Sequence, residues 1–245
     1  MWPFLRIVYP SDACPQCRKT LAQAVELAEK CRSQLVVLDT SRGGKSDPAG
    51  RIVELANGGR ANLIFMPRHG SGNCPGGLES TITAVLARAK CPVWIAPARE
   101  PKEGGPVLCA MEPRPGGEEH LDSAASIAQA YGRPLHLIHA VPEVGGVRQR
   151  LAAFERAMAW LLEFRRRLAR SAEVAVHAGE VVKVVVRAAQ SRGASLLVIG
   201  HGECGGTPGH LGSHAYRIAR EASCPVLVGA PTASVSLTRE KQRAA

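Results

Sequence analysis

The chain has 245 residues, of which 45% are hydrophobic but only 4% aromatic, so we expect Val, Ile, Leu and Ala to fill its core. It contains no run of about 18 apolar residues and no basic and apolar leader, so we expect no membrane partner and a cytoplasmic location with reduced thiols. The net charge of +10 invites a nucleic-acid interpretation, but no binding motif accompanies it and aromatic residues are not interleaved with the basic ones. We therefore expect no nucleic-acid partner.

Apolar runs alternate with helical patterns along the first hundred residues. In chain order these are the apolar run 7–12, the helical pattern 21–31, the apolar run 35–39, the buried run 61–67 and a helix with a terminal apolar run in 80–97. Such runs are apolar on both faces, as in parallel sheets that helices cover on both sides. The alternation predicts an α/β fold with right-handed crossovers.

The second half of the chain repeats this order. Segments 7–12, 21–31 and 35–39 align with segments 100 positions later, and segments 61–67 and 80–97 align with segments 133 positions later. Two constant offsets indicate a duplication with one extra block in the second copy, after Val141. The block holds a basic amphipathic helix, rich in Arg between 148 and 170, and a strand at 172–177.

The repeat predicts two Rossmann-like open parallel sheets. We expect a degenerate domain at residues 1–100 (the first repeat), a fuller domain at 105–231 (the second repeat), and a basic, disordered tail at 232–245. The second repeat would have five strands. The first would lack the third strand and the helix before it, which leaves its second strand, 35–39, at a sheet edge. The following loop or a partner chain would then cover that edge.

The segment Leu196–Gly229 carries a specific pattern: a buried strand, a glycine-rich loop, a helix, and then Cys-Pro-Val-Leu-Val. In this it resembles the universal stress protein family, here in a tandem arrangement. The resemblance implies the adenine-nucleotide-alpha-hydrolase-like fold, with strand order 3-2-1-4-5. It also implies that the terminal strands 91–96 and 224–229 meet as in the dimers of this family, giving an intramolecular pseudo-dimer that could itself form a homodimer.

The resemblance also implies binding of ATP or another adenine nucleotide by the second repeat. Backbone N–H groups at a helix start attract phosphates, and glycines allow close approach. Carried over residue by residue, the phosphate loop comprises Gly200, His201, Gly202, Gly212 and Ser213, the acid facing ribose is Glu112, and the residues near the base are His139 and Ala140. Gly200 to Gly212 spans one position fewer than the family pattern. In the first repeat Pro67 and Glu79 replace the outer glycines, which favours binding by the second repeat alone.

A Cys-Pro-Gln-Cys motif suggests a different chemistry in the first repeat. Cys14 and Cys17 follow the first strand, and His69 and Cys74 follow the strand at 61–67, which the implied order places beside it. These four residues could bind zinc, or the cysteine pair could be a redox disulfide, or the thiols could be incidental. The second repeat has no cysteines at the matching positions, so the fold does not require them, and a thioredoxin fold does not account for the repeat.

We therefore expect a regulatory or sensory module of the universal stress type. We expect no enzyme, because the sequence offers no nucleophile with a base and an orienting group. Two alternatives stay open: a thiol-redox or zinc module built on the Cys-Pro-Gln-Cys loop, and an interaction scaffold without a ligand.

Overall fold

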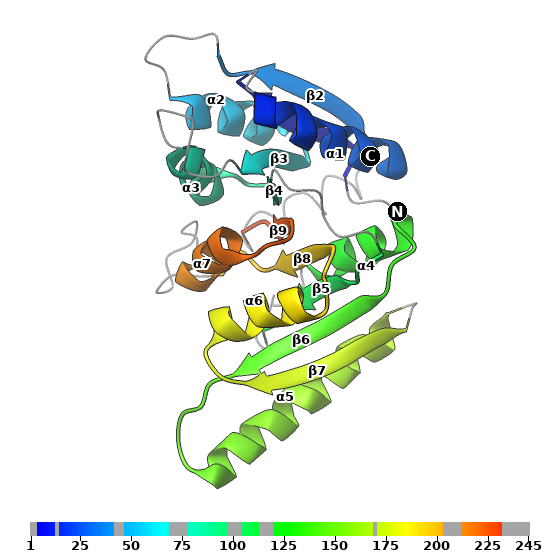
Figure 1. The fold of residues 1–245 in the computed structure, drawn as a ribbon, viewed down its shortest axis with the longest axis vertical. Coiled ribbons are helices and arrows are strands. Elements are labelled where there is room, and N and C mark those ends of the chain that lie inside the picture. Colours follow the sequence, from blue (N-terminus) through cyan, green and yellow to red (C-terminus); the bar gives the residue numbers. More distant parts are fainter. Residues whose placement is uncertain are drawn as a thin grey trace. The chain divides into compact units, whose positions relative to one another are not determined.

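A computed structural model describes residues 4–12, 15–41, 47–68, 78–97, 104–112, 120–168, 171–202 and 212–231 (Figure 1). The chain forms two compact units. One is built from residues of 1–100, 201–213 and 227–245, and the other from residues of 101–200 and 214–226. The first repeat therefore lies in one unit, and most of the second repeat lies in the other.

The first repeat forms a parallel sheet with strand order β2-β1-β3-β4. Its elements are β1 (Arg6–Ser11), α1 (Pro15–Cys31), β2 (Gln34–Asp39), α2 (Pro48–Leu55) with a π-helical turn (Ala56–Arg60), β3 (Leu63–Arg68), α3 (Leu78–Arg88) and β4 (Val93–Pro97). Within the described part of this repeat there are four strands, and β2 pairs with β1 alone. The predicted loss of the third strand and its helix is confirmed, as is the edge position of β2.

Aromatic side chains, rather than the expected aliphatic ones, form one layer of the first repeat's core. Tyr9, Phe65 and Trp94 follow one another across β1, β3 and β4, with ring centroids 5.9 Å and 5.7 Å apart. The Tyr9 hydroxyl donates to the backbone oxygen of Cys17 at 2.7 Å and so ties β1 to α1. Three of the ten aromatic residues of the chain thus lie side by side, which the average composition does not reveal.

The second repeat forms a parallel sheet with strand order β7-β6-β5-β8-β9, which is the predicted order 3-2-1-4-5. Its elements are β5 (Val107–Ala110), α4 (Leu121–Ala130), β6 (Leu135–Val141), α5 (Val147–Arg167), β7 (Ala172–Ala178), α6 (Val181–Ser191), β8 (Leu196–Ile199), α7 (Ser213–Glu221) and β9 (Val226–Val228). The β8 backbone also bonds the segment entering β9, from Leu197 N–H to Pro225 O at 2.9 Å.

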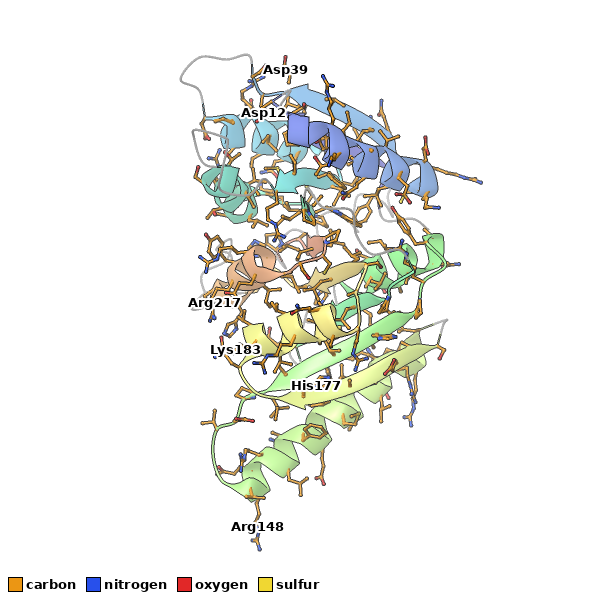
Figure 2. The ribbon with its side chains drawn as sticks, in the orientation of Figure 1. Asp12, Asp39, Arg148, His177, Lys183 and Arg217 are labelled. Atoms are coloured by element: carbon orange, nitrogen blue, oxygen red, sulfur yellow. The ribbon has the colours of Figure 1, made fainter. Side chains whose placement is uncertain are left out.

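The extra block of the second repeat consists of α5 and β7. Figure 1 shows α5 running along β6 and β7, and it buries Ala157, Leu161 and Phe164 against them. Its arginines lie on the outer face, with Arg148 at the tip in Figure 2, so the predicted basic amphipathic helix is confirmed. No helix in the described ranges is both long and apolar enough to cross a membrane. The pairing of the two terminal strands stays a prediction.

Candidate functional site

Two histidines hold the exit of β5 in the second repeat. The His120 Nε2 lies 2.9 Å from the backbone oxygen of Ala110, and the His139 Nδ1 lies 2.8 Å from that of Met111. Because a carbonyl oxygen only accepts, each of these ring nitrogens must carry the proton. The last two residues before Glu112 are therefore fixed, and the exposed Glu112 follows them at the carboxyl end of the strand.

His120 also explains why glycine stands at position 200, immediately after β8. A Cβ added at Gly200 would lie 3.3 Å from Cε1 of the His120 ring, which is 6% exposed. In the first repeat both positions differ. Thr20 stands at the position of His120 and is smaller, and Pro67 stands at the position of Gly200 and is larger. His120 was not among the site residues predicted from the sequence. The sequence signal was the pairing of two polar residues, Thr20 and His120, directly before the matching helical patterns of the two repeats.

The two ends of the glycine-rich loop meet. Gly202 has φ +70°, which favours glycine, and a Cβ there would lie 3.2 Å from the Gly212 Cα. The Gly212 N–H donates to the His201 oxygen at 3.1 Å. Helix α7 then begins at the exposed Ser213, so its unpaired first N–H groups directly follow the closed end of the loop. Residues 203–211 lie outside the described ranges.

The imidazole ring of His201 is engaged with the backbone. It is only 8% exposed, with Nε2 at 3.0 Å from the Leu86 oxygen and Nδ1 at 3.2 Å from the Gly202 oxygen. Leu86 lies near the end of α3, where helix carbonyls lack partners within the helix. The ring is therefore used to hold the start of the loop, and only the backbone of His201 is left for a ligand.

Two cations gather at Glu180, the residue before α6, at the carboxyl end of β7. Arg217 of α7 lies 2.8 Å from its carboxylate and Lys183 lies 3.4 Å away, and Figure 2 shows both on the same side. Partial burial acts to raise the pKa of Glu180, but the hydrogen bonds from Lys183 and Arg217 outweigh it and hold the pKa below its usual value. Arg217 stands one turn after Ser213 on the same helix face.

The first repeat differs at the matching edge. Its acid after β1, Asp12, accepts a hydrogen bond from the Cys17 thiol at 2.9 Å. Strand β3 continues through Pro67 to Arg68, opposite Pro97 of β4, whereas β8 ends before Gly200. Pro67 keeps the chain extended where the second repeat turns into its loop. The side chain of Glu79 lies outside the described residues.

The predicted zinc or thiol group falls mainly on residues that the structure does not describe. Cys14, His69 and Cys74 lie outside the described ranges. Cys17 is 3% exposed and is not in a disulfide, and its thiol donates to Asp12. Among the residues with described side chains, no group of three or more His, Cys, Asp and Glu is arranged to hold a metal ion. The zinc and redox hypotheses stay predictions.

Two open parallel sheets with a closed glycine loop after the fourth strand of the second define a tandem Rossmann-like α/β protein. The model of the universal stress protein family matches residues 40–97 and 105–229. The chain therefore belongs to this family. No curated protein matches the chain.

Solved structures agree with this assignment of the fold. A protein from Pseudomonas aeruginosa UCBPP-PA14, described as a universal stress protein, is 20% identical with a TM-score of 0.66, covering 96% of this chain and 86% of its own. A universal stress protein from Archaeoglobus fulgidus DSM 4304 is 17% identical with a TM-score of 0.61, covering 92% of this chain and 96% of its own. At such identities the likeness concerns the fold alone.

Proposed function

We propose that the second repeat binds an adenine nucleotide and that the chain is a regulatory module rather than a catalyst. The observation that carries the proposal is the closure between Gly202 and Gly212, which lets α7 begin at Ser213 with its first N–H groups unpaired in the helix. A helix start of this kind favours a phosphate group.

Each predicted residue has a role that its surroundings support. The N–H groups of Gly200, His201 and Gly202 and the hydroxyl of Ser213 would contact phosphate, and Glu112 would accept hydrogen bonds from ribose hydroxyls. The Gly212 N–H, which donates to the His201 oxygen, would close the loop beside the phosphate. The Nδ1 proton of His139 is used on Met111, so in the neutral ring Nε2 is an acceptor suited to the adenine amino group. Ala140, 5% exposed, adds an apolar contact beside it.

Selectivity for the second repeat follows from the first repeat's own contacts. The Asp12 carboxylate is engaged by the Cys17 thiol, and Pro67 has no N–H group to offer to a phosphate. Both features weaken the first repeat as a nucleotide site.

The test is calorimetric titration of the full chain with ATP, ADP and AMP, comparing the variants Ser213→Glu and Ser80→Glu. Both serines are exposed and occupy matching positions in the first turns of α7 and α3. A carboxylate at a helix start favours the helix, so both variants should fold. We expect Ser213→Glu to weaken binding at least tenfold, about 1.4 kcal/mol, by repelling phosphate, and Ser80→Glu to leave it unchanged. No binding by the parent, or equal binding by Ser213→Glu, would overturn the proposal.

A further inference from the structure

The edge strand β2 of the first repeat is uncovered at positions that are buried in the second repeat. Leu135 and Leu137 of β6 are 2% and 0% exposed, and β7 pairs alongside them. Their counterparts in β2 are Leu35, which is half-buried, and Val37, which is 52% exposed. No strand in the described ranges pairs with β2 on its outer side. The duplication thus left an apolar edge without the strand that would cover it.

The directions of the backbone groups identify which of them are open. The Gln34 N–H donates to the Leu5 oxygen at 2.9 Å and the Thr40 N–H to the Ser11 oxygen at 2.8 Å, so even-numbered residues face β1. Odd-numbered residues must then face outward, because successive residues alternate sides in a strand. Of these, Asp39 already accepts a hydrogen bond on its backbone oxygen from Arg51 at 3.0 Å. The open groups are the N–H and C=O of Leu35 and of Val37.

Nothing at the centre of the strand protects this edge. Natural sheets blunt their edges with charged side chains, proline or a bulge, and the residues from Gln34 to Leu38 contain none of these, in unbroken register with β1. The one charged residue of the strand, Asp39, stands at its end. The exposed side chain at its centre, Val37, is β-branched and apolar. An edge of this composition favours pairing with another strand.

We propose that a second copy of this chain pairs with β2 in the antiparallel direction, about a twofold axis beside Val36. Leu35 of each protomer then stands opposite the partner's Val37, and the four open N–H and C=O groups on each strand satisfy those of the other. A register centred on Val37 would require the Asp39 oxygen, which Arg51 already uses. A shift by one residue would set outward groups against inward ones. A second copy presents the same four groups in the reverse direction, so this pairing leaves none of them open on either strand, and for this reason we assign the edge to another copy.

The side chains fit the same register. On one face Leu35 lies beside the partner's Val37 at both ends of the pair, and on the other face the two Val36 side chains meet at the axis. Apolar cross-strand pairs of this kind stabilise antiparallel sheets. Because the same patch is used on both protomers, the assembly closes as a dimer and does not extend into a filament.

The first experiment is sedimentation of the full chain over a wide range of concentration. We expect a dimer that dissociates on dilution. The variant Val37→Lys, with a charge at the centre of the edge, should be monomeric at all concentrations. Val144→Lys is the matched control, since Val144 is also apolar and is 74% exposed, but in the loop before α5. A monomeric parent, a dimeric Val37→Lys protein or a growing series of oligomers would overturn the proposal.

A second experiment tests the register between the two β2 strands by cysteine cross-linking. The variants are oxidised mildly and run on non-reducing gels, and peptide mapping identifies the disulfide. Cα atoms of a directly opposed, non-hydrogen-bonded pair are about 4.5 Å apart, within disulfide range. We expect Val36→Cys to give a dimer linked through position 36. Gln34→Cys, which stands opposite the partner's Leu38, should give none above the level of the parent's native cysteines. Efficient linkage through position 34 and not 36 would exclude this register. The proposal does not depend on nucleotide binding.

Discussion

The thiol of Cys17 donates a hydrogen bond to Oδ1 of Asp12 at 2.9 Å, at the place where the second repeat carries Glu112. The contact requires the sulfur to hold its proton. It also engages the acid that the family resemblance assigns to ribose. The same pair of residues therefore bears on both hypotheses for the first repeat, since it occupies a nucleotide-site acid and uses a thiol that a metal site would need deprotonated.

Alkylation of the folded protein with iodoacetamide should leave the buried thiols unmodified. Cys17, Cys31 and Cys109 are 3%, 5% and 0% exposed. Burial raises the pKa of Cys31 to about 12, and burial likewise raises the pKa of Cys109. We expect iodoacetamide to label these three positions only after unfolding in urea, as measured by peptide mass spectrometry. Labelling of folded Cys17 at the rate of a free cysteine would instead support a reactive thiol.

Two conservative changes in the aromatic layer should differ in their effect. Tyr9→Phe removes a hydroxyl that donates to the Cys17 oxygen, and we expect a loss of about 1–2 kcal/mol in the free energy of unfolding. Trp94→Phe removes a buried N–H with no hydrogen-bond partner in the described structure, which offsets the lost ring volume. We expect its change to stay within about 1 kcal/mol in urea unfolding. A larger loss for Trp94→Phe than for Tyr9→Phe would contradict this expected order.

Substitution of Gly105 should be far more damaging than substitution of Gly58. A Cβ at Gly105 would clash with the backbone oxygen of Gly193, so the backbone entering β5 must shift. We expect Gly105→Ala to lower the free energy of unfolding by about 3 kcal/mol. A Cβ at Gly58 would meet nothing within 4 Å, so Gly58→Ala is the control and should be neutral or slightly stabilising. Equal urea midpoints for the two variants would contradict the close approach.

His136 should make the second repeat less stable in mild acid. Burial lowers its pKa, Glu173 opposes this from 3.1 Å, and Arg192 lowers it further. The folded protein then binds a proton less readily than the unfolded chain, so stability is retained above about pH 6.5 and falls as the pH drops below it. Urea midpoints measured from pH 8 to pH 5 should fall less steeply for His136→Gln than for the parent. Equal slopes would show that His136 does not contribute.

The duplication and the missing block could be read from the sequence itself, and the strand order followed from the family resemblance. Periodicity and local composition encode elements, and two constant offsets locate an insertion, so the assignments of α5, β7 and the edge strand β2 needed no three-dimensional information. The glycines at 200, 202 and 212 were also recognisable from their spacing after a buried strand. Such features depend on the order and spacing of residues along the chain, so they can be recognised from the sequence.

Contacts between elements were a different matter. The partners of Asp12, His120 and His201 lie on the strand exits, helix starts and helix ends that the fold brings near them, and no periodicity predicts which atoms will meet. The outward direction of Leu35 and Val37 likewise depends on the register between β1 and β2, since a shift of one residue would turn these groups inward. The sequence by itself determined the order and kind of the elements. Only the tertiary structure decided which side chains became available for a ligand or a partner, because availability depends on distances across the fold.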